Sequence, residues 1–349
     1  MRKMQNLSPD RLSRLSTLVD GARSIVVAAH THPDGDALGS ITALLHYFAG
    51  RGCPSVTAIL PDTPPESIRF ITGDDPRILF FDQTPEAVAA RIAESDLIVL
   101  ADCNAFSRTE GLEPLLKAAS APKVLIDHHL NPDSAAFQLV FSDSSMSSAS
   151  ELIYWILLEM KDIAGDPSRL PAASARALMA GMTTDTNNFA NSVTPSTLRM
   201  AAGLLEAGVD REAILSQLYQ RYRENRVRAM GWLQCEGLRI TPEGGAYLIA
   251  TREILRRFDV REGETEGLVN VPLSIGKVRI SVFLKEDEGH FRVSVRSKEG
   301  TSAQRLAATY FHGGGHEKAA GGKLHFPGDI ARPEDASAYI EKVLKEFLV

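Results

Sequence analysis

Four short apolar segments recur through the first part of the chain, and this recurrence constrains the fold more than any other feature. They are SIVVAAH (24–30), VTAIL (56–60), LIVLAD (97–102) and KVLID (123–127). Continuous runs of β-branched and aliphatic residues are typical of strands that are buried on both faces of a parallel sheet. Helix-like stretches separate them, around 38–48, 84–94 and 110–119. Strands that alternate with helices predict an α/β fold whose parallel sheet is flanked by helices on both faces.

The pattern changes after about residue 146, and the change predicts how the rest of the chain is divided. Further helices are expected at 147–160, 174–186 and 194–208. The segment 209–233 is polar, arginine-rich and helix-prone without a strong apolar face, so we interpret it as a connector. Strand-like runs dominate beyond it, and KVRISVFLKEDEGHFRVSVRS predicts a β-hairpin. We therefore predict a catalytic domain at 1–208, a helical linker at 209–233 and a smaller mixed-sheet α/β domain at 234–349.

Acidic and histidine residues follow three of the apolar runs, and one more aspartate ends a helix-like stretch. They are His30, Asp34, Asp36, Asp102, Asp127, His128, His129 and Asp185. Open α/β sheets bind ligands beyond the carboxyl ends of their strands, so we expect these side chains to gather there. Carboxylates and imidazoles with few cations nearby repel each other unless metal ions occupy the cluster. Oxygen and imidazole ligands without thiolate favour Mn²⁺, Mg²⁺ or Zn²⁺.

The spacing within this set fits a site for two metal ions. The Pro-Asp-Gly-Asp turn lets Asp34 and Asp36 reach two different ions, and we expect Gly35 to supply the backbone conformation that the turn requires. Asp102 has two oxygens and can bridge two ions, a geometry that supports phosphoryl transfer. Each piece alone is common, since such turns, His-His pairs and aspartates at strand ends occur in many folds. Their coincidence in four segments of one α/β frame is what indicates a metal site.

Composition narrows the classes of function. The net charge of −6 and the pI near 5.9 argue against a nonspecific binder of duplex DNA, which is usually basic. The cysteines Cys53, Cys103 and Cys235 form no CxxC pair, which favours cytosolic thiols. The longest apolar runs have the length of strands, and the first residues lack the apolar core of a secretory signal. No membrane span is therefore expected, and the cytoplasm is the expected location.

Five motifs, taken in order, resemble a known family. HTHPDGDALGS, ADCNAFSR, IDHHLN, TDTNNF and GGGHEKAAGG resemble the motifs of the DHH/DHHA1 phosphoesterases. The resemblance extends from about residue 20 to residue 325, and it is greatest to the branch that combines oligoribonuclease (nanoRNase) with 3′-phosphoadenosine 5′-phosphate phosphatase activity. The chain departs from the family pattern after TDT, where members often have glycine and this chain has Asn187 and Asn188.

The resemblance implies a role for each residue of the cluster. His30, Asp34 and Asp102 would hold one Mn²⁺, and Asp36, Asp102, His128 and Asp185 would hold a second, with Asp102 as the bridge. Asp127 would orient His128, and His129 would face the scissile phosphate and assist the leaving oxygen. Mg²⁺ or another divalent ion could take the place of Mn²⁺.

The second domain supplies the expected substrate contacts. Residues 292–325 contain six Lys or Arg and two acidic residues, in a chain that is acidic overall. Arg296 could bind phosphate through two hydrogen bonds, and exposed glycines let backbone N–H groups approach phosphate. The residues that match the family's substrate-binding motif are Ser294, Arg296, Gly314, Gly315 and His316. Arg108 is a further candidate for a phosphate contact.

The activity implied is hydrolysis of oligoribonucleotides of two to five nucleotides to mononucleotides, and of adenosine 3′,5′-bisphosphate to AMP, by water that two metal ions activate. The alternatives are an exopolyphosphatase or inorganic pyrophosphatase, a cyclic dinucleotide phosphodiesterase, and a noncatalytic nucleotide-binding regulator. The partner expected is a short single-stranded RNA or a nucleotide. The oligomeric state stays open, and a homodimer is compatible with the sequence.

Overall fold

The computed structural model describes residues 7–349, which divide into two compact units with the boundary between Gln220 and Arg221. The first unit ends with helix α8 (Arg211–Tyr219), and the second begins with helix α9 (Glu224–Trp232). Both helices lie in the segment for which the sequence predicts a helical connector. The domain limits at residues 208 and 234, and the role of segment 209–233 as a linker, remain predictions.

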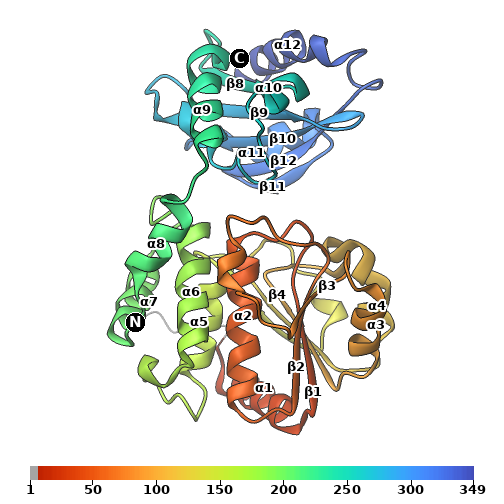
Figure 1. The fold of residues 1–349 in the computed structure, drawn as a ribbon, viewed down its shortest axis with the longest axis vertical. Coiled ribbons are helices and arrows are strands. Elements are labelled where there is room, and N and C mark those ends of the chain that lie inside the picture. The colour runs from red at the N-terminus through yellow and green to blue at the C-terminus, as the bar shows by residue number, and fades with distance from the viewer. Residues whose placement is uncertain (1–6) are drawn as a thin grey trace. The chain divides into compact units, whose positions relative to one another are not determined.

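The first unit contains a six-stranded parallel sheet, as predicted (Figure 1). Its order is β3-β2-β1-β4-β5-β6. The strands are β1 Ser24–Ala28, β2 Ser55–Leu60, β3 Ile78–Phe80, β4 Leu97–Ala101, β5 Lys123–Asp127 and β6 Leu139–Ser142. The chain order reverses between β1 and β4, and loops that follow neighbouring strands at such a reversal diverge to leave a ligand-binding crevice. The edge strands β3 and β6 were not predicted.

Helices cover both faces of this sheet because alternate strand residues point to opposite sides. Val27 belongs to one apolar core and the adjacent Val26 to another. The first core contains residues of α1 (Pro9–Gly21), α2 (Gly35–Gly50), α5 (Ala149–Leu158), α6 (Ala172–Asp185), α7 (Pro195–Glu206) and α8. The second contains residues of α3 (Pro85–Ala93) and α4 (Glu113–Ala118). In Figure 1, α2, α5 and α6 stand on the opposite side of the sheet from α3 and α4.

The close approach of α2 and α6 depends on two glycines. A Cβ at Gly39 would lie 2.7 Å from the carbonyl oxygen of Ala177 and 2.8 Å from the Cα of Gly181. Real Cβ atoms do not approach other atoms so closely. Gly35 also serves packing, since its φ is not positive and a Cβ there would overlap the side chain of Thr184. The prediction that Gly35 supplies an unusual turn conformation is therefore corrected.

The second unit is built on a mixed sheet, as predicted; it has six strands in the order β11-β12-β10-β9-β8-β7. Its strands are β7 Arg239–Ile240, β8 Gly245–Ala250, β9 Ile280–Glu286, β10 His290–Ser297, β11 Gly314–His316 and β12 Ala319–His325. Strands β8 and β9 are parallel and the other pairs antiparallel. The hairpin of β9 and β10 confirms the prediction. The glycine-rich segment forms β11 and β12, for which no strands were predicted.

The two faces of the second sheet are covered differently. Helices α11 (Ala303–Tyr310) and α12 (Ala336–Leu348) pack against one face. On the other face, Leu248 and Phe283 are covered by Leu233 and Leu268, near α9 and α10 (Arg252–Arg257). Within residues 7–349, no helix combines the length and the apolar character that a membrane span needs.

The α2–α6 contact generates a prediction about stability. Gly39→Ala should lower the free energy of unfolding by about 1–3 kcal/mol, because the added methyl group forces the two helices apart. Gly50→Ala in the same helix is the control, since its Cβ would meet only Pro171 Cγ, at 3.5 Å. Urea unfolding followed by circular dichroism measures both. Equal stability of the two variants would contradict the steric explanation.

Candidate metal centre

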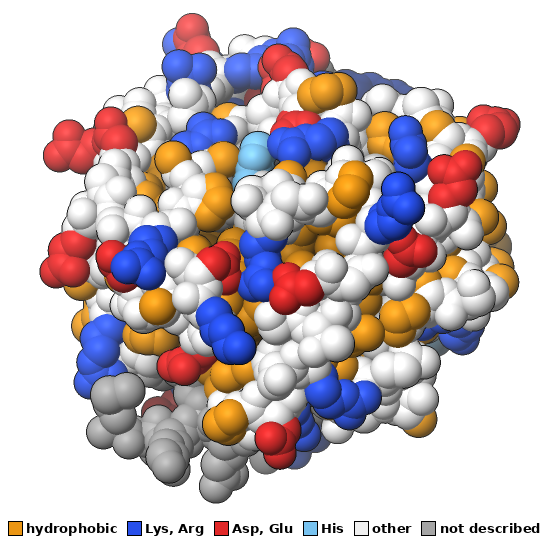
Figure 2. Space-filling view, turned by 90° about the horizontal axis from the view of Figure 1, so that it is seen from below, with side chains coloured by type: hydrophobic (Ala, Val, Ile, Leu, Met, Phe, Trp, Pro, Cys, Tyr) orange, Lys and Arg blue, Asp and Glu red, His pale blue; other side chains and the backbone are white. Residues whose placement is uncertain are grey.

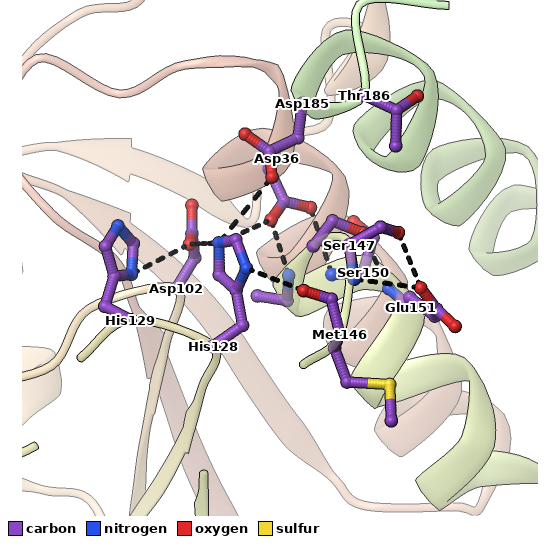
Figure 3. A network of polar contacts seen from close by, with 12 residues as sticks. Asp36, Asp102, His128, His129, Met146, Ser147, Ser150, Glu151, Asp185 and Thr186 are labelled. Carbon is purple, nitrogen blue, oxygen red and sulfur yellow. Dashed lines mark hydrogen bonds and ion pairs between the residues drawn. The ribbon is translucent and has the colours of Figure 1, made fainter. Parts of the chain in front are cut away.

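The predicted ligands lie at the ends of strands and helices that meet at the reversal of the sheet order. His30 follows β1, and Asp102 follows β4, its direct neighbour in the sheet. The side chain of Asp34 caps the start of α2, and Asp185 is the last residue of α6. Four segments distant in sequence therefore contribute side chains to one place, part of which Figure 3 shows.

Asp102 lies at the centre of this cluster. It is 1% exposed, and its backbone has a φ of 51°, a left-handed conformation that is uncommon outside glycine. Its Oδ2 lies 3.4 Å from His30 Nε2. Its Oδ1 lies 3.6 Å from His128 Nε2 and 3.6 Å from His129 Nδ1. The two oxygens of one carboxylate thus face two different sets of side chains, which a bridging ligand must do.

The potential ligand atoms form three overlapping groups, each with one atom per residue and all atoms within 4.8 Å of one another. The groups are His30, Asp34 and Asp102; Asp36, His128 and Asp185; and Asp102, His128 and His129. The first contains the three residues predicted for one metal site, and the second contains three of the four predicted for the other, without Asp102. The structure therefore brings together all six residues for which ligation was predicted.

Backbone groups orient the carboxylates. Asp36 accepts hydrogen bonds from the backbone N–H groups of Ala149 (2.6 Å) and Ser150 (3.0 Å) at the start of α5. Asp34 Oδ1 accepts from the N–H groups of Asp36 and Ala37, both at 3.0 Å. These bonds fix two carboxylates by the N-terminal ends of two helices, where the helix dipole favours negative charge.

The histidines are oriented in the same way. Nδ1 of His30 lies 2.7 Å from the carbonyl oxygen of Thr31, so it donates a proton there and leaves Nε2 facing Asp102. Nδ1 of His128 lies 3.4 Å from the carbonyl oxygen of Met146, and its Nε2 faces Asp36, Asp102 and Asp185. Backbone contacts of this kind are typical of histidines that bind metals.

The electrostatics of the cluster call for cations. Burial, together with the charges of Asp36 and Asp34, raises the pKa of Asp102 well above its usual range. Asp102 Oδ1 is buried and has no hydrogen-bond partner among residues 7–349. Burial alone would lower the pKa of His128, but the neighbouring carboxylates, Asp102 foremost, raise it to about 9. Divalent cations would satisfy the bare oxygen and offset the repulsion, so this donor set fits them.

Asp127 differs from its predicted role. Its fully buried carboxylate lies 2.7 Å from Nδ1 of His129 and accepts a hydrogen bond from the backbone N–H of His129 at 3.0 Å. An aspartate commonly bonds to the residue two positions later in this way. Asp127 therefore orients His129 rather than His128. Burial lowers the pKa of His129, and the charges of His128 and Arg108 act in the same direction.

Two further residues lie beside the cluster. The carbonyl oxygen of Arg108 accepts a hydrogen bond from the N–H of Thr31 at 2.8 Å, which joins its segment to the His30 loop. Cys103 is completely buried, and burial raises its pKa to about 12. It therefore carries a neutral thiol near pH 7, which is typical of a packing residue rather than a nucleophile.

Asn187 and Asn188, where the family often has glycine, have φ values of 46° and 57°. Asparagine tolerates this left-handed region better than most residues. The turn after Asp185 thus adopts a backbone conformation that glycine would also allow, and the departure from the family pattern leaves the position of Asp185 compatible with the cluster.

The predicted substrate-binding residues lie in the second unit, in two rows across three strands. Ser294, Gly321 and Gly314 form one row, and Arg296, Ala319 and His316 form the next. Because paired residues of antiparallel strands share a face, all six lie on one face. The central strand contributes only Gly321 and Ala319, so a shallow area separates Arg296 from His316. Gly315, between the two rows, has a φ of 143°, which favours glycine.

Sequence reasoning missed the contacts of segment 146–150. Met146, Ala149 and Ser150 contact the predicted ligands His128 and Asp36 through backbone groups, which carry no signature of residue type. The only available signal was Ser148-x-x-Glu151, a pattern typical of a helix start.

Comparisons with known proteins agree with this architecture. Residues 24–182 match the DHH family, N-terminal domain, and residues 245–346 match the DHHA1 domain. The bifunctional oligoribonuclease and PAP phosphatase NrnA of Bacillus subtilis is 29% identical over 303 residues, which are 86% of this chain and 90% of that protein. The probable bifunctional oligoribonuclease and PAP phosphatase NrnA of Streptococcus mutans is 28% identical over 325 residues, 92% of this chain and 95% of that protein. The crystal structure of an exopolyphosphatase-related protein from Bacteroides fragilis has 31% identity and a TM-score of 0.90, with 98% of this chain and 97% of that chain covered.

Asp102→Asn should have opposite effects on metal binding and on the stability of the metal-free protein. A raised pKa means that the ionised carboxylate destabilises the fold at any pH above its pKa in the unfolded chain. The amide removes this cost, so at pH 7 the metal-free variant should be more stable to thermal unfolding than the metal-free wild type. The stabilisation that Mn²⁺ gives the wild type should be lost.

Thermal unfolding in EDTA and in Mn²⁺ measures both effects. Asp62→Asn is a control, because Asp62 accepts hydrogen bonds from Thr31 and His32 next to the cluster but belongs to none of the three groups. A variant of Asp102 that Mn²⁺ stabilises as much as the wild type would refute the bridging assignment.

Proposed function

Because the chain belongs to the DHH/DHHA1 family, we propose that it is a divalent-metal-dependent phosphoester hydrolase whose substrates are short oligoribonucleotides and adenosine 3′,5′-bisphosphate. The observation that carries the proposal is the buried Asp102 carboxylate, which faces two groups of carboxylate and imidazole ligands at the carboxyl ends of β1 and β4. The names of the Bacillus subtilis and Streptococcus mutans relatives support the choice of substrates.

The ligand sets divide as follows. His30, Asp34 and Asp102 hold one ion, and Asp36, Asp102, His128 and Asp185 hold the other, with Mn²⁺ as the preferred ion. When bound, two such ions lower the pKa of water and offset the negative charge that develops on a phosphate in in-line displacement. The remaining chemistry falls to side chains that lie beside the cluster.

His129 is the proposed proton donor for the leaving oxygen. Asp127 accepts from Nδ1 of His129, which holds the ring in one orientation. A carboxylate in this position also stabilises the protonated ring. Arg108, close enough to influence His129 electrostatically, is the proposed contact for a non-bridging phosphate oxygen.

The second unit supplies the proposed contacts to the rest of the substrate. Arg296 and Ser294 flank an area of small residues, where a phosphate or a sugar can approach the backbone. Gly314 is exposed, and a Cβ there would meet nothing within 4 Å. Packing within the described part of the chain therefore does not require glycine here, and a side chain at this position would project into the space proposed for the substrate.

The charge distribution supports a short substrate. On the face drawn in Figure 2, basic and acidic side chains are interspersed rather than gathered into a continuous basic track. The net charge of the chain is −6. A long single strand is usually bound by a basic groove with aromatic residues at intervals. Mononucleotides and short oligonucleotides need only a few local contacts, such as those proposed for Arg108 and Arg296.

A panel of substrates tests the proposal and its alternatives. With Mn²⁺, a dinucleotide RNA and adenosine 3′,5′-bisphosphate should be hydrolysed faster than a long single-stranded RNA, pyrophosphate, polyphosphate or cyclic di-AMP, and EDTA should abolish turnover. Preferred cleavage of pyrophosphate, polyphosphate or the cyclic dinucleotide would establish one of the other phosphohydrolases instead. Nucleotide binding without hydrolysis in Mn²⁺ would indicate a noncatalytic regulator.

Gly314→Ala should raise the KM for adenosine 3′,5′-bisphosphate about tenfold, the effect of one misplaced methyl group in a binding site, without a change in thermal stability. Gly276→Ala is a matched control in the same unit, since its Cβ would also meet nothing within 4 Å. Steady-state kinetics and thermal unfolding of both variants provide the measurement. An unchanged KM for the Gly314 variant would remove β11 from the proposed substrate site.

A further inference from the structure

Glu151 is a fully buried acidic residue in the first turn of α5, and it is not among the proposed metal ligands. Five donors surround its carboxylate. They are Ser147 N (3.0 Å), Ser147 Oγ (2.5 Å) and Thr197 Oγ1 (2.8 Å) to Oε2, and Ser196 Oγ (2.5 Å) and Trp155 Nε1 (3.4 Å) to Oε1. Figure 3 shows Glu151 next to Ser147, on the side of that segment away from His129.

These hydrogen bonds join three parts of the first unit. Ser147 lies in the segment before α5, Trp155 lies one turn along α5, and Ser196 and Thr197 lie at the start of α7. Each carboxylate oxygen accepts from an N–H group, which can only donate, so both oxygens must act as acceptors. A carboxylate meets this requirement because both of its oxygens can accept. The side-chain amide of a glutamine would place its NH₂ group, which only donates, opposite some of these donors.

The segment that Glu151 holds contacts two ligands of the same proposed ion. The carbonyl oxygen of Met146, next to Ser147, faces Nδ1 of His128. Three residues further, the N–H groups of Ala149 and Ser150 bind both oxygens of Asp36. A shift of segment 146–150 would therefore move an imidazole and a carboxylate together. His30 and Asp34 contact backbone groups of another segment, those of Thr31, Asp36 and Ala37.

Helix capping alone does not explain why a glutamate occupies position 151. The side chain of Ser148 already caps α5 by accepting from the N–H of Glu151 at 2.9 Å. The carboxylate of Glu151 reaches one residue further back, to the N–H of Ser147. Burial of a carboxylate opposes folding unless hydrogen bonds compensate it, and apolar residues often replace such groups without loss of stability.

We propose that Glu151 is a positioning residue for the ion held by Asp36, Asp102, His128 and Asp185: through Ser147 it fixes segment 146–150, which orients two of these four ligands, Asp36 and His128. The inference rests on the proposed metal-dependent function and adds to it a residue that touches neither ion nor substrate. It makes the affinity of one ion depend on a carboxylate that contributes no ligand atom.

Glu151→Gln tests the proposal, with Glu159→Gln as a matched control at the exposed end of the same helix. Mn²⁺ is titrated into each metal-free protein, and free Mn²⁺ is followed by electron paramagnetic resonance, which gives a dissociation constant for each class of site. Glu151→Gln should weaken one of the two sites about 10- to 100-fold, as loss of a residue that orients ligands does elsewhere. The other site should be unchanged, and Glu159→Gln should behave like the wild type.

Urea unfolding of each variant in EDTA separates positioning from general stability. Weakening of both sites to the same extent, together with lower stability of the metal-free protein, would overturn the proposal in favour of a structural role. Unchanged affinities at both sites in Glu151→Gln would also overturn it, while leaving the metal-dependent function intact. Failure of the wild type to bind Mn²⁺ would instead refute the proposed function, and this inference with it.

Ser147→Ala provides a second variant if Glu151→Gln does not fold. It removes the hydroxyl bond to Glu151 Oε2 and leaves the backbone bond in place. The proposal requires a smaller loss of affinity at the same single site. Equal affinity of Ser147→Ala and wild type at both sites would overturn it.

Discussion

Repulsion among buried carboxylates is the constraint on which the first unit depends. Asp36 and Asp102 are each 1% exposed, and the structure brings them together with Asp185 around His128. Such an arrangement opposes folding unless something offsets the charge. Part of the compensation is internal, because helix N-termini and the imidazole ring face these groups. Divalent cations would offset the remaining repulsion. The electrostatic repulsion that destabilises the metal-free fold is therefore also a source of affinity for metal.

The sequence predicts the parts of this architecture that have a strong local signal. Strands β1, β2, β4 and β5 are long apolar runs, and the residues after them mark the carboxyl edge of the sheet. The short edge strands β3 and β6, of three and four residues, have no such pattern. Strands β11 and β12 consist largely of glycine and alanine, which have low β propensity. They become strands because β10 offers an edge for pairing. This pairing is a long-range contact that the local sequence does not reveal.

In the candidate site, too, the sequence predicts residue types but not the contacts that depend on long-range structure. The residues proposed as ligands can be selected by residue type and spacing, but the partner of Asp127 cannot. Two histidines follow Asp127, and only the backbone turn determines which one it contacts. The role of Gly35 was inferred from its flexibility, whereas Thr184, distant in sequence, determines it through space. Backbone donors such as the N–H of Ala149 have no residue signature at all. Long-range packing and backbone geometry therefore account for what the sequence does not reveal.

The glycine contact between α2 and α6 has a consequence for how this protein responds to metal. Gly39 lies one turn after Asp36, and Gly181 lies one turn before Asp185, so the interhelical separation at the glycines also governs the spacing of two acidic ligands. Occupancy of the proposed metal site and packing of this helix pair are then thermodynamically linked. Bound cations would stabilise the α2–α6 contact, and a tightly packed contact would in turn increase the affinity for the cations by the same free energy. Chelation would accordingly loosen the interior of the domain as well as empty a surface crevice.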